Sequence, residues 1–188
     1  FNFHSAVGAS AYYQTLSTMK TKKDKLAIVL EKAEQIRKAI YESKLFPFDL
    51  CGACALASKE LFEFGRKKRL PVQFCYVAYD HCFNMFDNRV IDITAGQFLS
   101  EYMGEVAVLS KREARKHYIW KKPDVIASNK RELRGAAQII KLDSWDKQSP
   151  ILYEFVEHGG KLTLIEKKEN RRFLKPLKTL DLLCSEII

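Results

Sequence analysis

Cys51, His81 and Asp92 occur in this order along the sequence and are the residue types of a thiol acyl-transfer site. In such a site the cysteine is the nucleophile, the histidine is the base that takes its proton, and the carboxylate orients the histidine. A thiol with its usual pKa of about 8.5 is mostly protonated at neutral pH, but a helix N-terminus or a neighbouring imidazolium lowers that pKa. The three residues therefore predict attack on an amide carbonyl, provided that the fold brings them together.

A helix is predicted to begin beside the cysteine. Asp49 stands at the N-cap position before the apolar-periodic run Leu50–Phe64, and Gly65 is placed to end the helix as its C′ residue. The backbone N–H of Cys51 would then lie in the first turn, where it has no intrahelical acceptor and can stabilise an oxyanion. Gln97 is a candidate for the second oxyanion donor by its residue type.

A β-hairpin is predicted to carry the histidine and the aspartate. Two strands, His81–Phe86 and Arg89–Ile93, flank a turn at Asp87-Asn88. If the residues that flank the turn pair with each other, alternation along the strands puts four side chains on one face: His81, Phe83, Asp92 and Thr94. The aspartate then lies diagonally opposite the histidine, within reach of its ring, and Phe83 contributes to the wall of the cleft.

The same stretch resembles transglutaminase-like members of the papain-like cysteine peptidase and acyltransferase superfamily. Those proteins have a cysteine opening a helix, a later glycine, a strand, the motif H-[AC]-[WF], and D-x-T-[AS] after a hairpin. This sequence has Cys51, Gly65, a strand expected over 72–79, His81-Cys82-Phe83 and Asp92-Ile93-Thr94-Ala95. The segments F-P-x-x-x-C-G at 46–52 and I-D-I-T-A-x-Q-F at 91–98 also resemble small bacterial transglutaminase-like proteins. Phe83 departs from the family pattern, because many members carry Trp there.

The resemblance leaves two cysteines as candidate nucleophiles. The segment C-G-A-C-A-L-A-S at 51–58 is similar to C-G-[SA]-C-[WY] of papain-like enzymes, in which the second cysteine reacts, and this match favours Cys54. Cys51 precedes Gly65 by 14 residues and Cys54 precedes it by 11, and the transglutaminase-like spacing favours Cys51. We take Cys51 as the expected nucleophile and Cys54 as the alternative, since residues three apart on a helix can both face one cleft.

The resemblance implies a cysteine-dependent hydrolase or acyltransferase that acts on a protein or peptide through a Cys-His-Asp triad and a thioester. It also implies an α+β fold with a papain-like or transglutaminase-like core, in which N-terminal helices pack on an antiparallel sheet. This mechanism needs no metal and no cofactor. Two alternatives belong to other classes: a non-catalytic basic binding module on the same fold, and a redox or zinc protein. The latter would use the CxxC of Cys51 and Cys54, and for zinc also Cys75, His81 and Cys82.

The 188 residues are expected to form a single domain, 1–188, with three parts. Residues 1–45 are the N-terminal helical segment, residues 46–98 hold the core motifs, and residues 99–188 form a basic α/β portion. Apolar periodicity and turn residues give the remaining elements: helices over Thr21–Ser43, Ser110–His117 and Arg131–Ile140, and strands over Val72–Tyr79, Tyr118–Ile126 and Lys161–Ile165, the last after a turn at Gly159-Gly160.

The positive charge of the chain is concentrated late. The net charge is +9, and from Lys111 onward 18 Lys and Arg residues face 11 Asp and Glu residues, which is +7 of that total. A solvated surface is the simpler interpretation. The alternative is that this part of the chain forms a face that binds an acidic partner. Basic surfaces of this kind also bind nucleic acid and anionic lipid, but we do not expect nucleic acid to be the partner here.

Composition bounds the setting of the protein. With 47% hydrophobic residues the chain can bury a proper core, so disorder is not expected as its main state. No run reaches about 18 apolar residues, so no membrane span is expected, and no secretory leader is visible. Five cysteines are an odd number and favour reduced thiols, which predicts a cytoplasmic location.

Overall fold

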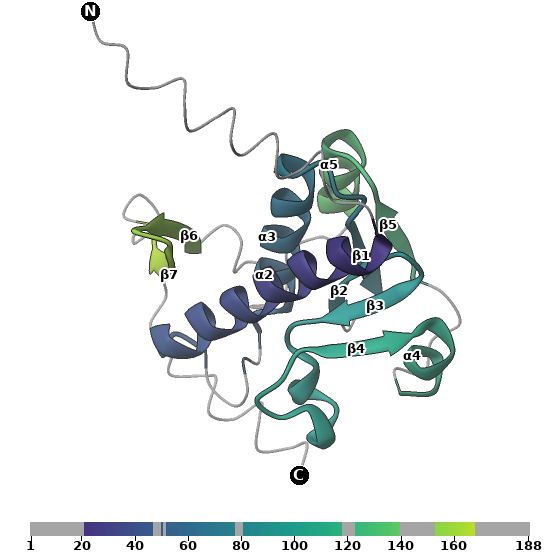
Figure 1. The fold of residues 1–188 in the computed structure, drawn as a ribbon, viewed down its shortest axis with the longest axis horizontal. Coiled ribbons are helices and arrows are strands. Elements are labelled where there is room, and N and C mark those ends of the chain that lie inside the picture. Colours follow the sequence, from purple (N-terminus) through teal and green to yellow (C-terminus); the bar gives the residue numbers. More distant parts are fainter. Residues whose placement is uncertain are drawn as a thin grey trace, which may run out of the picture.

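The computed structural model describes residues 21–46, 50, 52–77, 81–117, 123–139 and 153–167 (Figure 1). The helices are α2 (Lys22–Ser43), α3 (Cys54–Lys67), α4 (Lys111–His117) and α5 (Lys130–Ile139), with 3-10 turns η1 (Ala95–Gln97) and η2 (Ser100–Tyr102). The strands are β1 (Gln73–Val77), β2 (His81–Phe86), β3 (Arg89–Asp92), β4 (Ala107–Ser110), β5 (Val125–Ala127), β6 (Tyr153–His158) and β7 (Lys161–Glu166). The fold is α+β, as predicted, with helices and an antiparallel sheet.

Five strands form the main sheet in the order β4-β3-β2-β1-β5, and every neighbouring pair is antiparallel. The hairpin of β6 and β7 forms a separate two-stranded sheet. Helix α2 packs against α3 and against β7, while α3 packs on β2 and β1 (Figure 1). The strand that opens with His81 therefore lies at the centre of the main sheet, directly under the helix that opens with Cys54.

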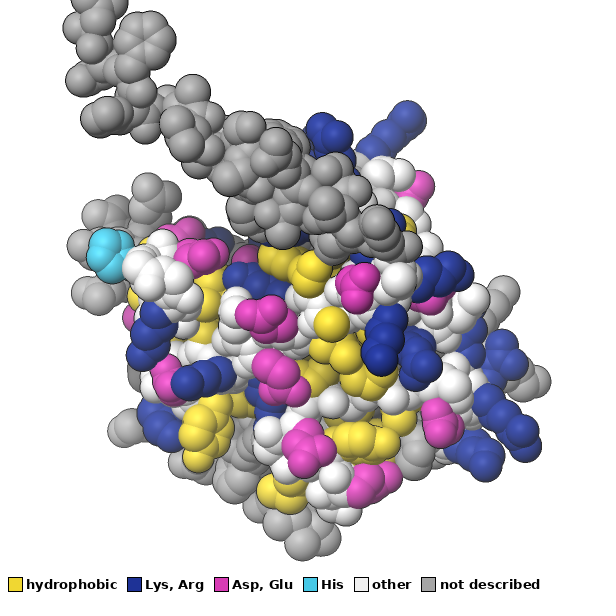
Figure 2. Space-filling model, in the orientation of Figure 1, with side chains coloured by type: hydrophobic (Ala, Val, Ile, Leu, Met, Phe, Trp, Pro, Cys, Tyr) yellow, Lys and Arg dark blue, Asp and Glu magenta, His cyan; other side chains and the backbone are white. Residues whose placement is uncertain are grey.

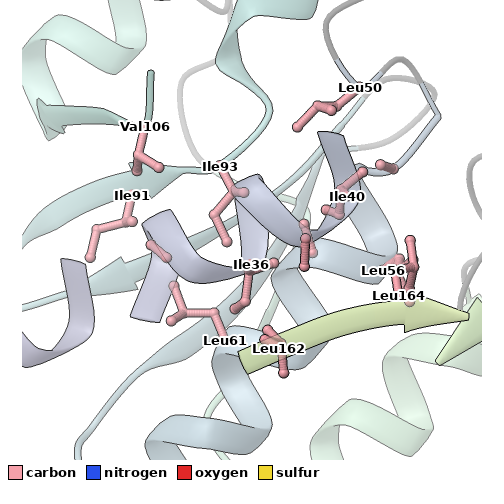
Figure 3. Close-up of a cluster of buried hydrophobic side chains, with 14 of the residues drawn as sticks. Ile36, Ile40, Leu50, Leu56, Leu61, Ile91, Ile93, Val106, Leu162 and Leu164 are labelled. Carbon is pink, nitrogen blue, oxygen red and sulfur yellow. The ribbon is translucent and has the colours of Figure 1, made fainter. Parts of the chain in front are cut away.

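The largest apolar core lies where α2, α3 and both sheets meet. Figure 3 shows side chains of α2, α3 and β7 pointing toward those at and just after β3; the labelled residues include Ile36, Ile40, Leu56, Leu61, Ile91, Ile93, Leu162 and Leu164. A second core covers the opposite face of the main sheet, where Phe83, Val90 and Leu109 pack with Ala114 of α4. Burial on both faces explains why the two central strands, β2 and β3, contain so few exposed residues.

Helix α2 confirms the helix predicted over residues 21–43, with Thr21 as its cap and not its first residue. The Thr21 side chain accepts a hydrogen bond from the Asp24 N–H at 3.2 Å, which satisfies one of the first-turn donors. At the other end Lys44 adopts the left-handed conformation (φ 57°), and its N–H donates to the carbonyl of Tyr41. Among the described helices none is both long and apolar enough to cross a membrane.

Helix α3 begins later than predicted. Leu50 (φ 72°) and Gly52 (φ 81°) both have left-handed backbone angles, and a hydrogen bond from Ala53 N–H to the Leu50 carbonyl (3.0 Å) closes a tight turn ahead of the helix. Ala53 is the N-cap residue and Cys54 is the first helical residue. The predicted start at Leu50 is therefore wrong, and Asp49, its predicted cap, lies outside the described residues. A turn before the helix gives Cys54, and not Leu50, the first helical position.

Gly65 does not end α3, which corrects a second prediction. The helix continues to Lys67 and closes in a Schellman motif: Leu70 N–H donates to the Gly65 carbonyl at 2.7 Å, and Arg69 N–H donates to the Arg66 carbonyl at 3.1 Å. Arg69 takes the left-handed position (φ 55°) that a glycine usually occupies. Gly65 serves a different purpose, since a Cβ at this position would lie 2.6 Å from the Val72 side chain.

Gly65→Ala is accordingly expected to destabilise the protein, although alanine favours helices. The added methyl group would force Val72 or the start of β1 to move, and overpacking of this kind costs about 1–3 kcal/mol. Urea unfolding monitored by circular dichroism measures the change. Gly135→Ala in α5 is the matched control, because no atom of the described residues lies within 4 Å of its added Cβ. A Gly65→Ala protein as stable as the wild type would contradict the close packing.

The hairpin prediction is confirmed in its register. Phe86 pairs with Arg89, and Asp87 (φ 47°) and Asn88 (φ 65°) both have positive φ angles, as a type I′ turn requires. Lys22 Nζ contacts Asp87 at 3.1 Å, which ties the turn to the start of α2. Strand β3 ends at Asp92, one residue earlier than expected.

Asn84 connects three elements: α3, β1 and β2. Its Nδ2 group, on β2, donates to the Ser58 carbonyl of α3 at 2.9 Å and to the Gln73 carbonyl of β1 at 3.2 Å. The side chain is fully buried. One amide therefore holds α3 on the sheet.

The later elements agree with the sequence only in part. Helices α4 and α5, strand β7 and the turn at Gly159-Gly160 were predicted, with boundaries that differ by one residue. Strand β1 is shorter than the expected run over residues 72–79, and β5 occupies only the end of the run predicted over residues 118–126; Ala78–Asp80 and Tyr118–Lys122 lie outside the described residues. Strands β4 and β6 were missed.

Candidate active site

His81 and Asp92 are in direct contact. His81 Nε2 lies 2.6 Å from Asp92 Oδ2, and both side chains are buried, with exposed fractions of 4% and 0%. The contact is possible because the hairpin register puts the first residue of β2 diagonally opposite the last residue of β3. An imidazole held this way has one nitrogen fixed by the carboxylate and the other directed elsewhere.

The carboxylate of Asp92 is itself held in place. Its second oxygen, Oδ1, accepts hydrogen bonds from the Thr94 N–H at 2.9 Å and the Thr94 hydroxyl at 3.3 Å. Arg37, buried in α2, donates to the carbonyl of Ile93 at 2.9 Å. These contacts fix the segment that follows β3, so the orientation of His81 is determined by α2 as well as by its own hairpin.

Cys54 is the sulfur that accompanies this pair. It is the first residue of α3, is only 2% exposed and packs in one cluster with Cys82 of β2, and its thiol interacts electrostatically with the His81 imidazole. A helix N-terminus and a neighbouring imidazole are the two surroundings that favour a thiolate. The fold therefore brings the Cys54 sulfur to the histidine that contacts Asp92.

The surroundings of the pair shift both pKa values upward. Burial, the largest single influence on His81, lowers its pKa, but the charge and hydrogen bond of Asp92, with a smaller contribution from Cys54, outweigh burial and raise the pKa from 6.5 to about 10. The hydrogen bond with Cys82 and burial raise the pKa of Cys54 well above its usual value, and His81 acts in the opposite direction. At neutral pH the site rests as an imidazolium beside a neutral thiol.

Cys51, the expected nucleophile, lies outside the described residues. Its neighbour Gly52 donates its N–H to Gln97 Oε1 at 3.4 Å, which brings Gln97 beside the turn that precedes α3. The other end of that amide, Nε2, is buried and has no hydrogen-bond partner among the residues that the structure describes. Gln97 therefore presents an unused donor next to the start of the helix.

Two aromatic rings flank His81. Phe83, proposed as a cleft wall, is fully buried, with its ring centroid 6.2 Å from that of His81. Phe98 packs its ring against the imidazole in an edge-to-face arrangement, with centroids 4.8 Å apart, and is 51% exposed. Phe83 belongs to the core beneath the site, and Phe98 is the ring that meets solvent.

Metal-binding geometry is not found in the described part of the chain, where no group of three or more His, Cys, Asp or Glu side chains could hold an ion. Cys54, Cys75 and Cys82 are present as thiols. Burial raises the pKa of Cys75 to about 12, which makes it a core residue and not a reactive one.

Sequence reasoning missed three contributors to the site. Arg37 was hidden in the amphipathic pattern of α2, where a long polar side chain reads as surface. Cys82 was taken for a small apolar core residue, and Phe98 was noted only as part of a motif. The adjacency of Cys82 to His81 gave no signal for its contact with Cys54, because successive side chains of a strand point to opposite faces of the sheet.

Compared with protein-family models, with curated proteins and with solved structures, the chain gave no match.

Proposed function

We propose that the chain is a cysteine-dependent acyl-transfer enzyme that attacks an amide of a protein or peptide. In this proposal Cys54 is the nucleophile, His81 is the general base and acid, and Asp92 orients the imidazole. One observation carries it: the Cys54 thiol, at the first residue of a helix, lies close enough to interact electrostatically with a buried histidine that contacts a carboxylate at 2.6 Å. A nucleophile, a base and an orienting group brought together in this way are typical of an activated nucleophile.

The reaction would proceed through a thioester. The resting site, an imidazolium beside a neutral thiol, first loses the thiol proton to solvent and becomes a thiolate–imidazolium pair. The sulfur then attacks the carbonyl carbon, and the C–N bond breaks as the imidazolium gives its proton to the leaving nitrogen, which leaves His81 neutral and able to take a proton from the water or amine of the second step. Water then resolves the thioester, which gives a peptidase or deamidase, or an amine resolves it, which gives a transamidase. Because Cys82 opposes ionisation of Cys54, we expect the reactive thiolate–imidazolium form to be a minor species in the closed site.

Gln97 is the proposed side-chain donor to the oxyanion. Its buried Nε2 has no hydrogen-bond partner among the described residues, and its Oε1 is turned toward Gly52, next to the helix that opens with Cys54. A buried donor without an acceptor is unfavourable by about 1–3 kcal/mol unless something compensates it. A developing oxyanion is such an acceptor, so the same amide is better satisfied in the transition state than at rest.

The finer fold and setting belong to this proposal too. A helix opening at the cysteine, packed on an antiparallel sheet that carries His81 and Asp92, supports a papain-like or transglutaminase-like core. Reduced thiols at Cys54, Cys75 and Cys82 favour a cytoplasmic location.

In Figure 2 dark-blue Lys and Arg side chains gather along the right-hand edge, over α4 and the start of α2, which supports docking of an acidic partner there.

Cysteine variants test the proposal. Wild-type protein is incubated with dimethylcasein and with peptides, and new amino groups, released ammonia and incorporated amine are measured. Cys54→Ser is expected to abolish turnover, because serine at this site is a far weaker nucleophile, while Cys51→Ser and the core control Cys75→Ser should retain it. Mass spectrometry should find the hydroxylamine-sensitive acyl group on Cys54.

Each of the other outcomes contradicts one part of the proposed function. Loss of turnover in Cys51→Ser with retention in Cys54→Ser would make Cys51 the nucleophile. An absence of acylation at both positions, with iodoacetamide labelling that does not change in His81→Ala, would favour the non-catalytic binding module. Detection of bound zinc in the wild type would favour the metal protein. Detection of a Cys51–Cys54 disulfide that disappears in both Cys51→Ser and Cys54→Ser would favour the redox protein.

A further inference from the structure

Phe98 is a solvent-exposed aromatic residue whose ring contacts the proposed base, His81. His81 is almost fully buried, and of its two aromatic neighbours Phe83 is fully buried while Phe98 is 51% exposed. The edge-to-face contact at 4.8 Å means that one part of the Phe98 ring covers the imidazole and the rest faces solvent. A substrate group that approaches the imidazole from the solvent side of Phe98 would therefore contact this ring.

We propose that the exposed face of Phe98 is a subsite for an apolar side chain on the amine side of the reacting amide. This inference rests on the proposed function, in which His81 delivers a proton to the leaving nitrogen. Proton transfer requires that nitrogen to approach within about 3 Å of an imidazole nitrogen. The side chain attached to the leaving nitrogen is only a few bonds further away, which is the distance at which the Phe98 ring lies.

The segment that carries Phe98 is anchored, so the ring is a fixed surface. Phe98 and Leu99 both donate their N–H groups to the Ala95 carbonyl at 2.9 Å, and Ala95 and Leu99 are buried in the second core. An aromatic side chain has few rotatable bonds, so a neighbouring group can cover it at a small entropic cost. An apolar partner gains by removing this exposed ring from water, and a carboxylate gains nothing from it.

The charges on the same segment favour the same class of occupant. Glu105 is exposed a few residues beyond Phe98, and the segment from Ala95 to Val106 carries no Lys or Arg that could pair with an acidic substrate side chain. An acidic side chain on the amine side of the substrate would therefore find no cation on this segment. We therefore expect Leu or Phe at that position to be preferred, Gly to be tolerated, and Asp to be disfavoured.

Internally quenched peptides that differ only in the residue supplying the leaving nitrogen test this subsite. The wild type should cleave the Leu and Phe peptides with a kcat/KM about 10-fold or more above that of the Gly peptide, the scale that apolar pockets achieve. Phe98→Ala should bring the Leu to Gly ratio near unity, and Phe98→Leu should keep the preference. Met103→Ala is the matched control, since Met103 is another exposed apolar residue, 65% exposed, on the next turn.

The outcomes separate this inference from the function on which it rests. Cys54-dependent cleavage with equal kcat/KM for Gly, Leu and Asp peptides would overturn the subsite and leave the enzyme standing. An equal fall for all peptides in Phe98→Ala would assign the ring a structural task only, and would also overturn the subsite. Absence of Cys54-dependent turnover with every peptide would overturn both.

Discussion

Asp92→Asn is expected to lower kcat/KM for Cys54-dependent amide turnover by about 10⁴-fold, the loss seen when a triad carboxylate becomes an amide. The 2.6 Å contact with His81 Nε2 now joins a carboxylate to a ring nitrogen. An amide in its place neither stabilises the imidazolium nor selects the same tautomer. The fall should appear in kcat, measured under saturating peptide, because the imidazolium forms during the reaction and not on binding.

The control for this variant is Asp87→Asn. Asp87 lies at the exposed turn of the same hairpin, where asparagine also accepts a positive φ, so the change of charge is identical and turnover should persist. Circular dichroism and urea unfolding show whether Asp92→Asn is still folded at the assay temperature. A folded Asp92→Asn protein with turnover close to the wild type would remove Asp92 from the mechanism.

His81 should make the stability of the protein fall as the pH rises above 6.5. Its pKa in the folded protein is about 10, against 6.5 for the ordinary side chain, so the folded state keeps a proton that the unfolded chain loses. The stabilisation is fully present below pH 6.5 and is lost progressively as the pH rises toward 10. The free energy of unfolding should therefore decrease by at most about 1.4 kcal/mol for each pH unit in this window.

Urea unfolding at several values between pH 6.5 and about pH 7.5 measures this slope, because thiols of the unfolded chain, with a pKa of about 8.5, are then still mostly protonated. His81→Gln is the informative comparison, since glutamine can donate to Asp92 but does not titrate. Its free energy of unfolding should be nearly independent of pH in this window. A wild-type free energy of unfolding that does not change between these pH values would contradict the presence of a buried imidazolium.

The hairpin was predictable because its information is local. Asp87 and Asn88 are among the few residues that accept positive φ angles, so the turn type and the register follow from the sequence alone. Period-two alternation then relates His81 to Asp92 without any knowledge of the rest of the fold. This is why the contact between base and carboxylate was predicted with its register.

The ends of α3 were mispredicted because tertiary packing decided them. Asp49 and Gly65 have the residue types of a cap and a stop, but Gly65 is a glycine because Val72 packs against it, and the stop lies at Arg69. At the other end, the left-handed angle of Leu50 is one that leucine rarely adopts, so nothing in the sequence announced the turn before Cys54. The expected nucleophile depended on where the helix began.

The two missed strands differ in the signal that the sequence carries. Strand β4 is four residues long at the edge of the sheet, and its assignment depends on pairing with β3, from which residues 93–106 separate it. Strand β6 pairs with β7 across the turn at Gly159-Gly160, so its partner is local, but only Tyr153 of its six residues is buried, where it packs on Phe46. The alternation typical of a half-buried strand is therefore weak in β6, whereas β4 is recognisable only once β3 is in place beside it.

The hydrogen bonds of Asn84 connect the two elements that carry the proposed nucleophile and the proposed base. The thiol and the imidazole belong to different elements, and the amide of Asn84 holds the helix of one over the strand of the other. In the proposed mechanism, local opening that breaks these hydrogen bonds would separate the thiol from the imidazole while most of the backbone remains ordered. We therefore expect the proposed activity to be lost at a lower temperature than the one at which the secondary structure melts.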